Sequence, residues 1–359
     1  MSSAMQFYVT SVLIVTCVNV IAAWGLDLQF GSTGINNFAF IIFSAAGAYT
    51  AAILSLGSSS QLGGFQQYVG GSRLPFPLPI IGGVIVAGLL AFVVGAITMR
   101  RLRGDYEAVV LLVLSLIATG TAMAEIGLVN GPAGLALIPK PLMSTLGLSS
   151  LAYQRVYLGW CLFLVLLVFL FLRRLLRAPF GRNLRAVRDN EAAAAAVGRN
   201  VFTLRMQSFV IGGMIAGLSG AVLVEFVNAW APGSWLYPET FALLTAIIVG
   251  GRANMGGVAI GTILVPVLFL EVTRFLPSIG YPGLIDALEW VVIGLLTLIF
   301  LWFRPQGLLP ERRRRFAPSF HLTPQPDQVV LRPLPVGPGL SSPYRPPMEA
   351  APAAEATSE

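Results

Sequence analysis

The sequence has very few of the residues on which most catalytic and metal sites depend. It contains one histidine, His321, and two cysteines, Cys17 and Cys161, which lie in separate apolar segments. One histidine excludes a histidine-based catalytic triad and a multi-histidine metal site. The cysteines have neither metal-site spacing nor a disulfide framework. We therefore expect no metal and no cofactor.

Motifs for ATP hydrolysis and other hydrolytic chemistry are also missing. The chain has a single lysine, Lys140, and no GxxxxGK[ST] motif, so it carries no P-loop ATPase of its own. It has no HExxH or GxSxG motif either. These absences predict a protein that is not an enzyme.

Charged residues are scarce. They make up 11% of the 359 residues, against 56% hydrophobic residues, whereas a soluble domain carries about 25% charged residues. Apolar segments near the ~20 residues that cross a bilayer recur along the chain. They lie at about 6–24, 34–56, 79–99, 106–126, 153–172, 204–224, 238–250, 256–275 and 286–303. This pattern predicts an all-α polytopic membrane protein with about 9–10 transmembrane helices.

The distribution of arginine between the loops predicts how the protein is oriented in the membrane. Three regions, 100–103, 173–205 and 304–315, are rich in arginine, whereas the alternate loops 127–152 and 225–240 are nearly free of basic residues. The positive-inside rule places the arginine-rich regions and the C-terminus in the cytoplasm. We expect a multi-pass protein of the cell (plasma or inner) membrane.

The segment 26–40, LDLQFGSTGINNFAF, decides the side of the N-terminus. Nine crossings would place it outside, and a tenth crossing hidden here would place it inside. Gly31, Gly34, Asn36 and Asn37 suit a broken or re-entrant segment that lines a wet cavity, and the alternative is an ordinary loop. If the segment is broken, these four residues are candidates for the translocation path of an uncharged or zwitterionic solute.

Small residues predict close contacts between helices. Gly213 and Gly217 form one GxxxG pair, and Gly257 and Gly261 form another. Such pairs let helix backbones approach closely in lipid. The motif GGRANMGG, 250–257, predicts a tight turn between two half-spans.

Acids inside the membrane segments are few. Glu125, Glu225 and Glu271 lie near the ends of predicted spans, where we expect them at the headgroups. No series of acids resembles a proton relay. This counts against an ion-coupled secondary transporter, which remains an alternative.

The last part of the chain differs from the rest. Residues 311–359 hold ten of the 24 prolines and no spanning apolar run. We expect a transmembrane domain at 1–310 and a disordered, Pro-rich cytoplasmic tail at 311–359. Its arginines at 312–315 favour membrane lipids over nucleic acid as a partner.

One charged patch interrupts the apolar chain: GRNLRAVRDNEAAAAAVGRN, 181–200. Residues 183–197 favour one helix, with Arg182, Arg185 and Arg188 near one face and Gly198 as a C-cap. The alanines at 192–196 form a smooth surface. The patch is either a solvated loop or a docking surface for a cytoplasmic partner.

Several stretches, in this order, resemble one family. The similar stretches are GLDLQFGSTGINNFAFIIFSAAGAYTAAIL, RLRGDYEAVVLL, NGPAGL, the patch 181–200, IVGGRANMGGVAIGTIL and FRPQGLLPERRRR. The family is that of the LivM-type permease subunits of bacterial branched-chain amino acid ABC importers. The similarity extends over about residues 20 to 315.

The resemblance implies that the loop 173–205 couples the membrane helices to a separate ATPase. The residues it implicates are Arg185, Arg188, Asp189, Glu191, Ala192, Ala193 and Gly198. It implies these partners: a second homologous permease, two ATP-binding subunits and a periplasmic or lipid-anchored solute-binding protein. It implies branched-chain or related amino acids as substrates, with urea or short amides as the alternative. Glu191 and Gly198 are seven residues apart, whereas the general importer pattern has six.

Overall fold

A computed structural model describes residues 3–58, 65–100, 104–141, 143, 147, 149–269 and 284–311. Regular structure in these residues is helical, and the only extended pairings among them are the isolated bridges Tyr68–Val129 and Leu135–Trp230. The predicted all-α class is confirmed. Residues 101–103, Glu271 and the predicted tail from 312 onward lie outside the described residues.

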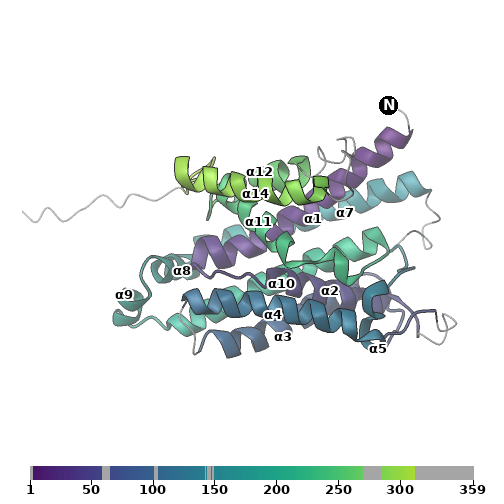
Figure 1. The fold of residues 1–359 in the computed structure, drawn as a ribbon, viewed down its shortest axis with the longest axis horizontal. Coiled ribbons are helices and arrows are strands. Elements are labelled where there is room, and N and C mark those ends of the chain that lie inside the picture. Colours follow the sequence, from purple (N-terminus) through teal and green to yellow (C-terminus); the bar gives the residue numbers. More distant parts are fainter. Residues whose placement is uncertain are drawn as a thin grey trace, which may run out of the picture. The chain divides into compact units, whose positions relative to one another are not determined.

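Five of the described helices are long and apolar enough to cross a membrane. They are α1 (Ser3–Thr33), α3 (Leu78–Thr98), α4 (Gly104–Ala124), α7 (Ser150–Arg177) and α10 (Val201–Val227). They run side by side (Figure 1). Outward-facing apolar residues such as Leu89, Val109 and Leu166 are exposed, as hydrocarbon-facing residues are in a membrane protein.

Four shorter helical segments complete the bundle. They are α2 (Phe40–Ser55), α11 (Tyr237–Gly250), α12 (Met255–Thr262) with its π-helical continuation η4 (Ile263–Phe269), and α14 (Leu284–Phe303). The apolar segment predicted at 238–250 is a 14-residue helix that begins at Tyr237. Pro266 lies inside η4; because proline has no amide hydrogen to donate, the regular α-helical ladder cannot continue there.

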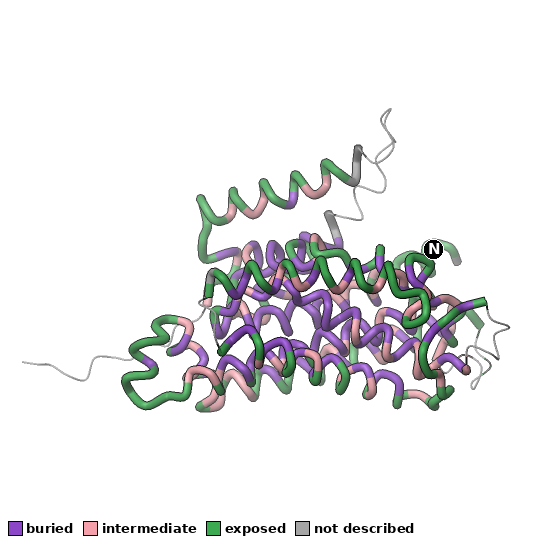
Figure 2. The backbone as a smooth tube through the Cα atoms, turned by 60° about the horizontal axis from the view of Figure 1, so that its bottom comes forward, coloured by how far each residue is buried: buried purple, intermediate pink, exposed green. Residues whose placement is uncertain are grey.

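Helix α10 forms the centre of the bundle and packs against α1, α2 and α3, where buried residues gather (Figure 2). Small residues allow this approach. A Cβ atom on Gly213 would lie 2.5 Å from Cβ of Ala91, and one on Gly217 would overlap Ala87. Gly257 and Gly261 of α12 lie equally close to the backbone of α11. In lipid, such close packing supplies the attraction that hydrophobicity cannot.

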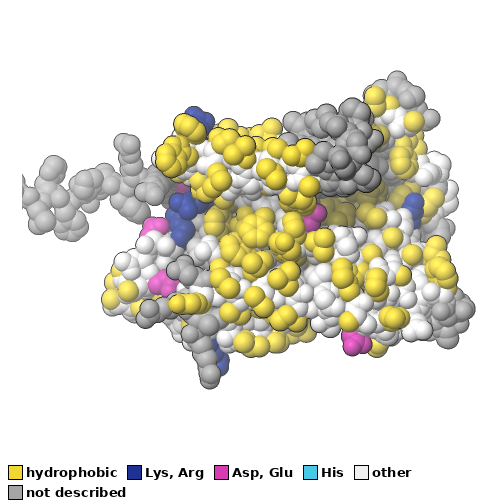
Figure 3. Space-filling view, viewed as in Figure 1, with side chains coloured by type: hydrophobic (Ala, Val, Ile, Leu, Met, Phe, Trp, Pro, Cys, Tyr) yellow, Lys and Arg dark blue, Asp and Glu magenta, His cyan; other side chains and the backbone are white. Residues whose placement is uncertain are grey.

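Most described arginines lie at one end of the bundle, here called the arginine end. It comprises the ends of α1 and α7, α8 (Pro179–Asp189), α9 (Glu191–Ala196), the turn 251–254 and the segment 304–311. Asp27 ties the turn to α1 by accepting a hydrogen bond from the Ala253 amide (2.8 Å), and Asn254 donates to the Leu309 carbonyl (3.1 Å). Arginines of this end form the dark blue cluster at the left of Figure 3.

The opposite end holds the start of α1 and three short elements. These are α5 (Ile126–Val129), η2 (Gly131–Ala133) and η3 (Pro232–Ser234). Gln66 binds the backbone of Ala136 at this end, and Arg155 of α7 donates to the Gln6 side chain of α1 (2.9 Å). The described helices therefore run between two ends, each held together by its own hydrogen bonds.

The break predicted at 26–40 is shorter than expected. Helix α1 continues through residue 33, and only residues 34–39 are non-helical before α2 begins. The polar residues of 26–33 remain helical because they have partners: Asp27 binds the Ala253 amide and Gln29 donates to the Phe209 carbonyl (2.8 Å). No tenth crossing lies in this segment.

Candidate functional site

The charged patch forms two helices, so the predicted single helix over 183–197 is wrong. Helix α8 ends at Asp189, and α9 begins at Glu191. Between them Asn190 is extended (φ −161°, ψ 107°), and its side chain accepts a hydrogen bond from the Ala193 amide (3.0 Å). Asparagine is a strong N-cap, so the chain starts a new helix rather than continuing the old one.

Helix α8 has one buried face and one polar face. Gly181, Leu184 and Val187 are buried at a helical spacing that faces the bundle, and the helix packs against α1, α7 and α10. Arg182 is exposed, so it does not join the other two arginines.

Arg185 and Arg188 share one carboxylate. Arg185 Nε lies 3.3 Å from Glu311 Oε1, and Arg188 Nη2 lies 3.0 Å from Glu311 Oε2. Arg188 also lies 3.3 Å from the exposed Asp189. Because Arg188 and Glu311 are largely buried, with side chains 15% and 17% exposed, solvent screens their attraction less than at an open surface.

Helix α9 presents a small, smooth surface. Ala194 turns inward and is buried, whereas Ala192, Ala193, Ala195 and Ala196 are exposed. Gly198 ends the helix with φ +80°, a conformation that glycine adopts without strain, and its amide donates to Ala195 (2.9 Å). Val197, next to it, is 75% exposed. The loop therefore ends in an apolar, uncovered patch, defined here as the α9 patch: Ala192, Ala193, Ala195, Ala196 and Val197.

Glu191 is already paired within the chain. Arg205 Nη1 of α10 lies 2.9 Å from Glu191 Oε1, and Arg205 also pairs with Glu107 of α4. Glu107 and Arg205 are buried, whereas Glu191 is half exposed. The sequence predicted neither pair, because 98 residues separate Glu107 from Arg205. The result is a direct link from α9 to two long helices.

Arg188 also links α8 to the end of α1. Its Nη1 donates to the Gly31 carbonyl (2.6 Å), and its side chain lies against Gly34. Gly34 has φ +82° and a Cβ there would lie 3.1 Å from Arg188 Cγ. Only glycine fits both this backbone and this contact. Arg188 therefore holds α8 against the point where the chain leaves α1.

Several polar groups of residues 34–39 have partners inside the bundle. The Asn37 side chain donates to Gln29 Oε1 (2.8 Å) and accepts from the Ala39 amide (3.0 Å). At the start of α2 the Ile41 amide donates to Thr240 Oγ1 of α11 (3.3 Å). These bonds allow a non-helical backbone inside the bundle, which lipid would not tolerate.

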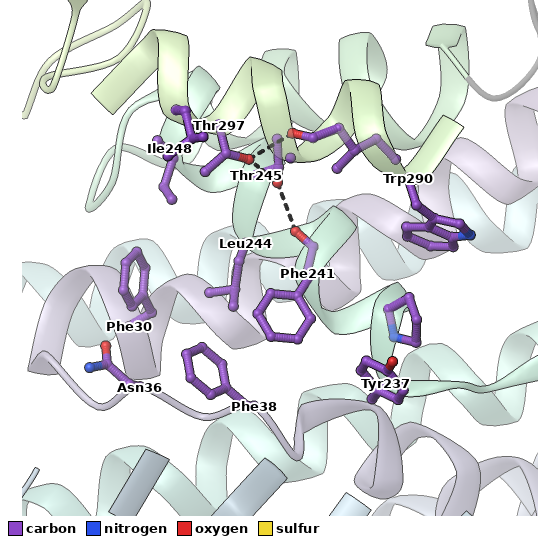
Figure 4. Close-up of a pocket in the computed structure, with 14 residues that line it drawn as sticks. Phe30, Asn36, Phe38, Tyr237, Phe241, Leu244, Thr245, Ile248, Trp290 and Thr297 are labelled. Atoms are coloured by element: carbon purple, nitrogen blue, oxygen red, sulfur yellow. Dashed lines mark hydrogen bonds between the residues drawn. The ribbon is translucent and has the colours of Figure 1, made fainter. Parts of the chain in front are cut away.

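A cavity of about 820 Å³ lies beside this segment, within the size range of small-molecule sites. Figure 4 shows Phe30, Asn36 and Phe38 on one side of it, α11 in the middle and α14 on the other side. Phe38 and Phe241 stack with their ring centroids 5.1 Å apart. The residues that line this cavity, here called the α11–α14 cavity, are Phe30, Asn36, Phe38, Tyr237, Pro238, Phe241, Leu244, Thr245, Ile248, Trp290, Ile293, Gly294, Thr297 and Leu298.

The lining is aromatic and aliphatic with few polar groups and no charge. Thr245 and Thr297 are hydrogen bonded to each other (2.6 Å), and Asn36 supplies an amide. Of the four predicted path residues, Asn36 alone lines this cavity. Gly31 binds Arg188, Gly34 packs on it, and Asn37 is buried in the hydrogen bonds described above. The lining residues of α11 and α14 were not predicted, because their sequence shows no motif.

One acid lies where the sequence did not predict it. Glu225, near the end of α10, is 2% exposed and packed inside the bundle rather than open to its surroundings. Its Oε2 has no partner among the described residues. A buried carboxyl group of this kind is costly and is a candidate for a functional role.

Comparison with known proteins places the whole bundle in one family. The family model described as "Branched-chain amino acid transport system / permease component" matches residues 8–301. The probable branched-chain amino acid transport permease protein LivM of Methanocaldococcus jannaschii is 29% identical over 321 residues, which cover 81% of this chain and 90% of that protein.

Other relatives carry different names. The high-affinity branched-chain amino acid permease protein LivM of Escherichia coli is 29% identical over 326 residues, which cover 83% of this chain and 69% of that protein. The guanosine ABC transporter permease protein NupQ of Bacillus subtilis is 24% identical over 226 residues, 61% of this chain and 67% of that protein. No solved structure matches. With a family model that matches nearly all of the described bundle, the chain belongs to the permease components of the branched-chain amino acid transport systems.

Proposed function

We propose that this chain is the membrane-spanning permease subunit of an ABC importer for branched-chain or related amino acids. Its partners are a second homologous permease, two ATP-binding subunits and a periplasmic or lipid-anchored solute-binding protein. The family match and the relatives named above support this assignment. The chain has no ATP-binding motif, so we infer that it contributes the path and the ATPase contributes the energy.

The arginine end faces the cytoplasm in this proposal. Arg173, Arg177, Arg182, Arg188 and Arg304 all belong to elements of that end, and cytoplasmic loops carry the excess of arginine. The loop 173–205 and the C-terminus are then cytoplasmic, and the start of α1 lies outside. The α9 patch then faces the cytoplasm, where the ATPase subunit can bind it.

One observation carries the mechanism: Arg188 joins the loop to the break beside the cavity. It binds Gly31 and touches Gly34, and Asn36 and Phe38 of the same break line the α11–α14 cavity. When the ATPase moves α8 and α9, the pull is transmitted through Arg188 to residues 34–39. We infer that this changes the shape of the cavity and so alternates its access.

The cavity favours a solute with an apolar side chain over the alternatives. Its aromatic and aliphatic walls suit a branched side chain, and its few polar groups suit a limited number of orienting contacts. Urea or a short amide is too small and polar to contact much of this apolar lining. An ion-coupled transporter that holds its ion with an acidic side chain would need an acid here, and none of the lining residues is charged.

Filling the cavity tests this assignment. Gly294 lines it, and a Cβ there would meet no atom within 4 Å. The variant Gly294→Phe is expected to reduce uptake of radiolabelled leucine by the assembled importer at least about tenfold, since a ring in the path costs well over the ~1.4 kcal/mol that corresponds to this factor.

The matched control is Gly159→Phe on α7. Gly159 is exposed and also has no atom within 4 Å of a Cβ, but it does not line the cavity. Its uptake should equal that of the unchanged protein. Normal uptake by Gly294→Phe, in a complex that assembles normally, would assign the path elsewhere.

The α9 patch allows a separate test of ATPase docking. Val197→Asp places a charge on an exposed valine, and burying that charge against an apolar groove is costly. We expect the amount of ATPase subunit that co-purifies to fall several-fold, without loss of the permease from the membrane. Arg182→Gln, an exposed change on α8, is the control; equal co-purification by both variants would remove the patch from the interface.

A further inference from the structure

A second cavity, of about 690 Å³, lies at the arginine end and has no role in the proposed transport path. It is enclosed by the end of α7, α8, the start of α12 and the segment 309–311. Its lining residues are Phe169, Arg173, Leu176, Arg177, Arg185, Ala253, Asn254, Met255, Gly256, Leu309, Pro310 and Glu311. None of these residues belongs to the α9 patch or to the α11–α14 cavity.

The charges of this cavity are unbalanced. It contains three guanidinium groups and one carboxylate, Glu311, which Arg185 and Arg188 already share at 3.3 and 3.0 Å. Arg173 and Arg177 are one helical turn apart, and neither forms an ion pair with an acid among the described residues. Arg173 instead lies over the Phe169 ring, 5.8 Å from its centroid. An anion bound here would balance the excess positive charge of the cavity.

The surface that leads to the cavity is apolar. Leu162, Leu166 and Leu170 of α7 follow one another at helical spacing and are 54%, 55% and 53% exposed. The same face of the helix continues to Arg173 and Arg177 at its last turns. An amphiphile lying along α7 would place its chain on the leucines and its headgroup between the arginines.

We propose that this cavity binds the phosphate headgroup of an anionic phospholipid, with the acyl chains along the exposed leucines of α7. A soluble phosphate would use the arginines but not the leucines, so the lipid accounts for both features. Basic pockets between helices at the cytoplasmic surface are the usual form of such sites. The bound lipid would join Arg173 and Arg177 of α7 to Arg185 of α8, next to the coupling loop.

The test compares Arg173→Gln/Arg177→Gln with Arg174→Gln in the full-length chain. Arg174 is exposed and does not line the cavity, so it controls for the loss of surface charge. Binding of phosphatidylglycerol is measured by native mass spectrometry and by fluorescence titration with vesicles of phosphatidylcholine and phosphatidylglycerol. Each arginine near a membrane surface is worth about fivefold in binding, so the double variant should bind about 25-fold more weakly, and Arg174→Gln, which removes a single charge, at most about fivefold more weakly.

A conservative variant separates binding from folding. Arg173→Lys/Arg177→Lys keeps the charge and should retain most of the bound phosphatidylglycerol, with the thermal stability of the unchanged chain. Three results would overturn the proposal. The first is an equal loss of lipid binding in the glutamine double variant and in Arg174→Gln. The second is displacement of the lipid by inorganic phosphate at a comparable concentration. The third is a glutamine double variant that loses ATPase co-purification while its lipid binding is unchanged. None of these results bears on the transport path, which the Gly294 variant tests.

Discussion

Replacing Arg205 with methionine is expected to lower the free energy of unfolding by about 3–5 kcal/mol, the cost of removing one partner of a buried ion pair. Arg205 is 9% exposed and Glu107 is 2% exposed, so methionine would leave the Glu107 carboxylate inside the bundle without its cation. Glu191, which is 53% exposed, can turn to water and adds little. Thermal unfolding and SDS-driven unfolding of the purified full-length protein in mixed micelles would measure the loss.

Two further variants identify the buried pair as the cause. Glu191→Gln removes only the exposed partner and should cost less than about 1 kcal/mol. Replacing both members, with Arg205→Met and Glu107→Met together, leaves no unpaired charge and should recover most of the stability. If Arg205→Met were as stable as the unchanged chain, or the double variant no more stable than the single one, the pair would not hold α4 to α10.

The variant Arg188→Ala is expected to separate ATP hydrolysis from transport. It removes the hydrogen bond to the Gly31 carbonyl (2.6 Å) and the ion pair with Glu311 (3.0 Å). Bonds to charged groups contribute about 1.5–3 kcal/mol each, so the link between α8 and α1 would be weakened by well over tenfold. Uptake by the reconstituted importer should fall about tenfold or more, while its ATPase activity continues.

Arg182→Ala is the matched control, because Arg182 lies on the same helix and is exposed. Its uptake and ATPase activity should both stay close to those of the unchanged complex. Unchanged uptake by Arg188→Ala would show that the pull reaches the cavity by another route. Parallel loss of ATPase activity would mean that α8 positions the ATPase rather than the break.

Much of the local structure follows from residue chemistry. The break after α1 falls at Gly34, which alone tolerates φ +82° beside Arg188, and α9 ends at Gly198 for the same conformational reason. The division at Asn190 was within reach of sequence analysis, since asparagine before a glutamate and a run of alanines is an N-cap signal. We predicted one helix because alanine, arginine and glutamate all favour helix, and the propensity of the neighbours outweighed the cap.

The site itself was only partly predictable. Asn36 was a candidate from its place in a Gly- and Asn-rich segment, but Phe38, Phe241 and Trp290 carry no such signal. Glu225 was expected at the headgroups from its distance to the span end, and it is buried. Both misses have the same origin: position along a helix is visible in the sequence, whereas the direction a side chain faces among several packed helices is not.

The sequence by itself determined the membrane class, the end of the bundle that carries the arginines, and the family, because these depend on composition and on local motifs. The tertiary structure decided that Glu311 joins Arg185 and Arg188, that Arg205 joins α4, α9 and α10, and that residues 34–39 meet α11 and α14 around one cavity. Apart from the pair of Arg205 with Glu191, each of these contacts joins segments far apart in the chain. They form only where helices pack closely, and that packing depends on all the small residues of the core together.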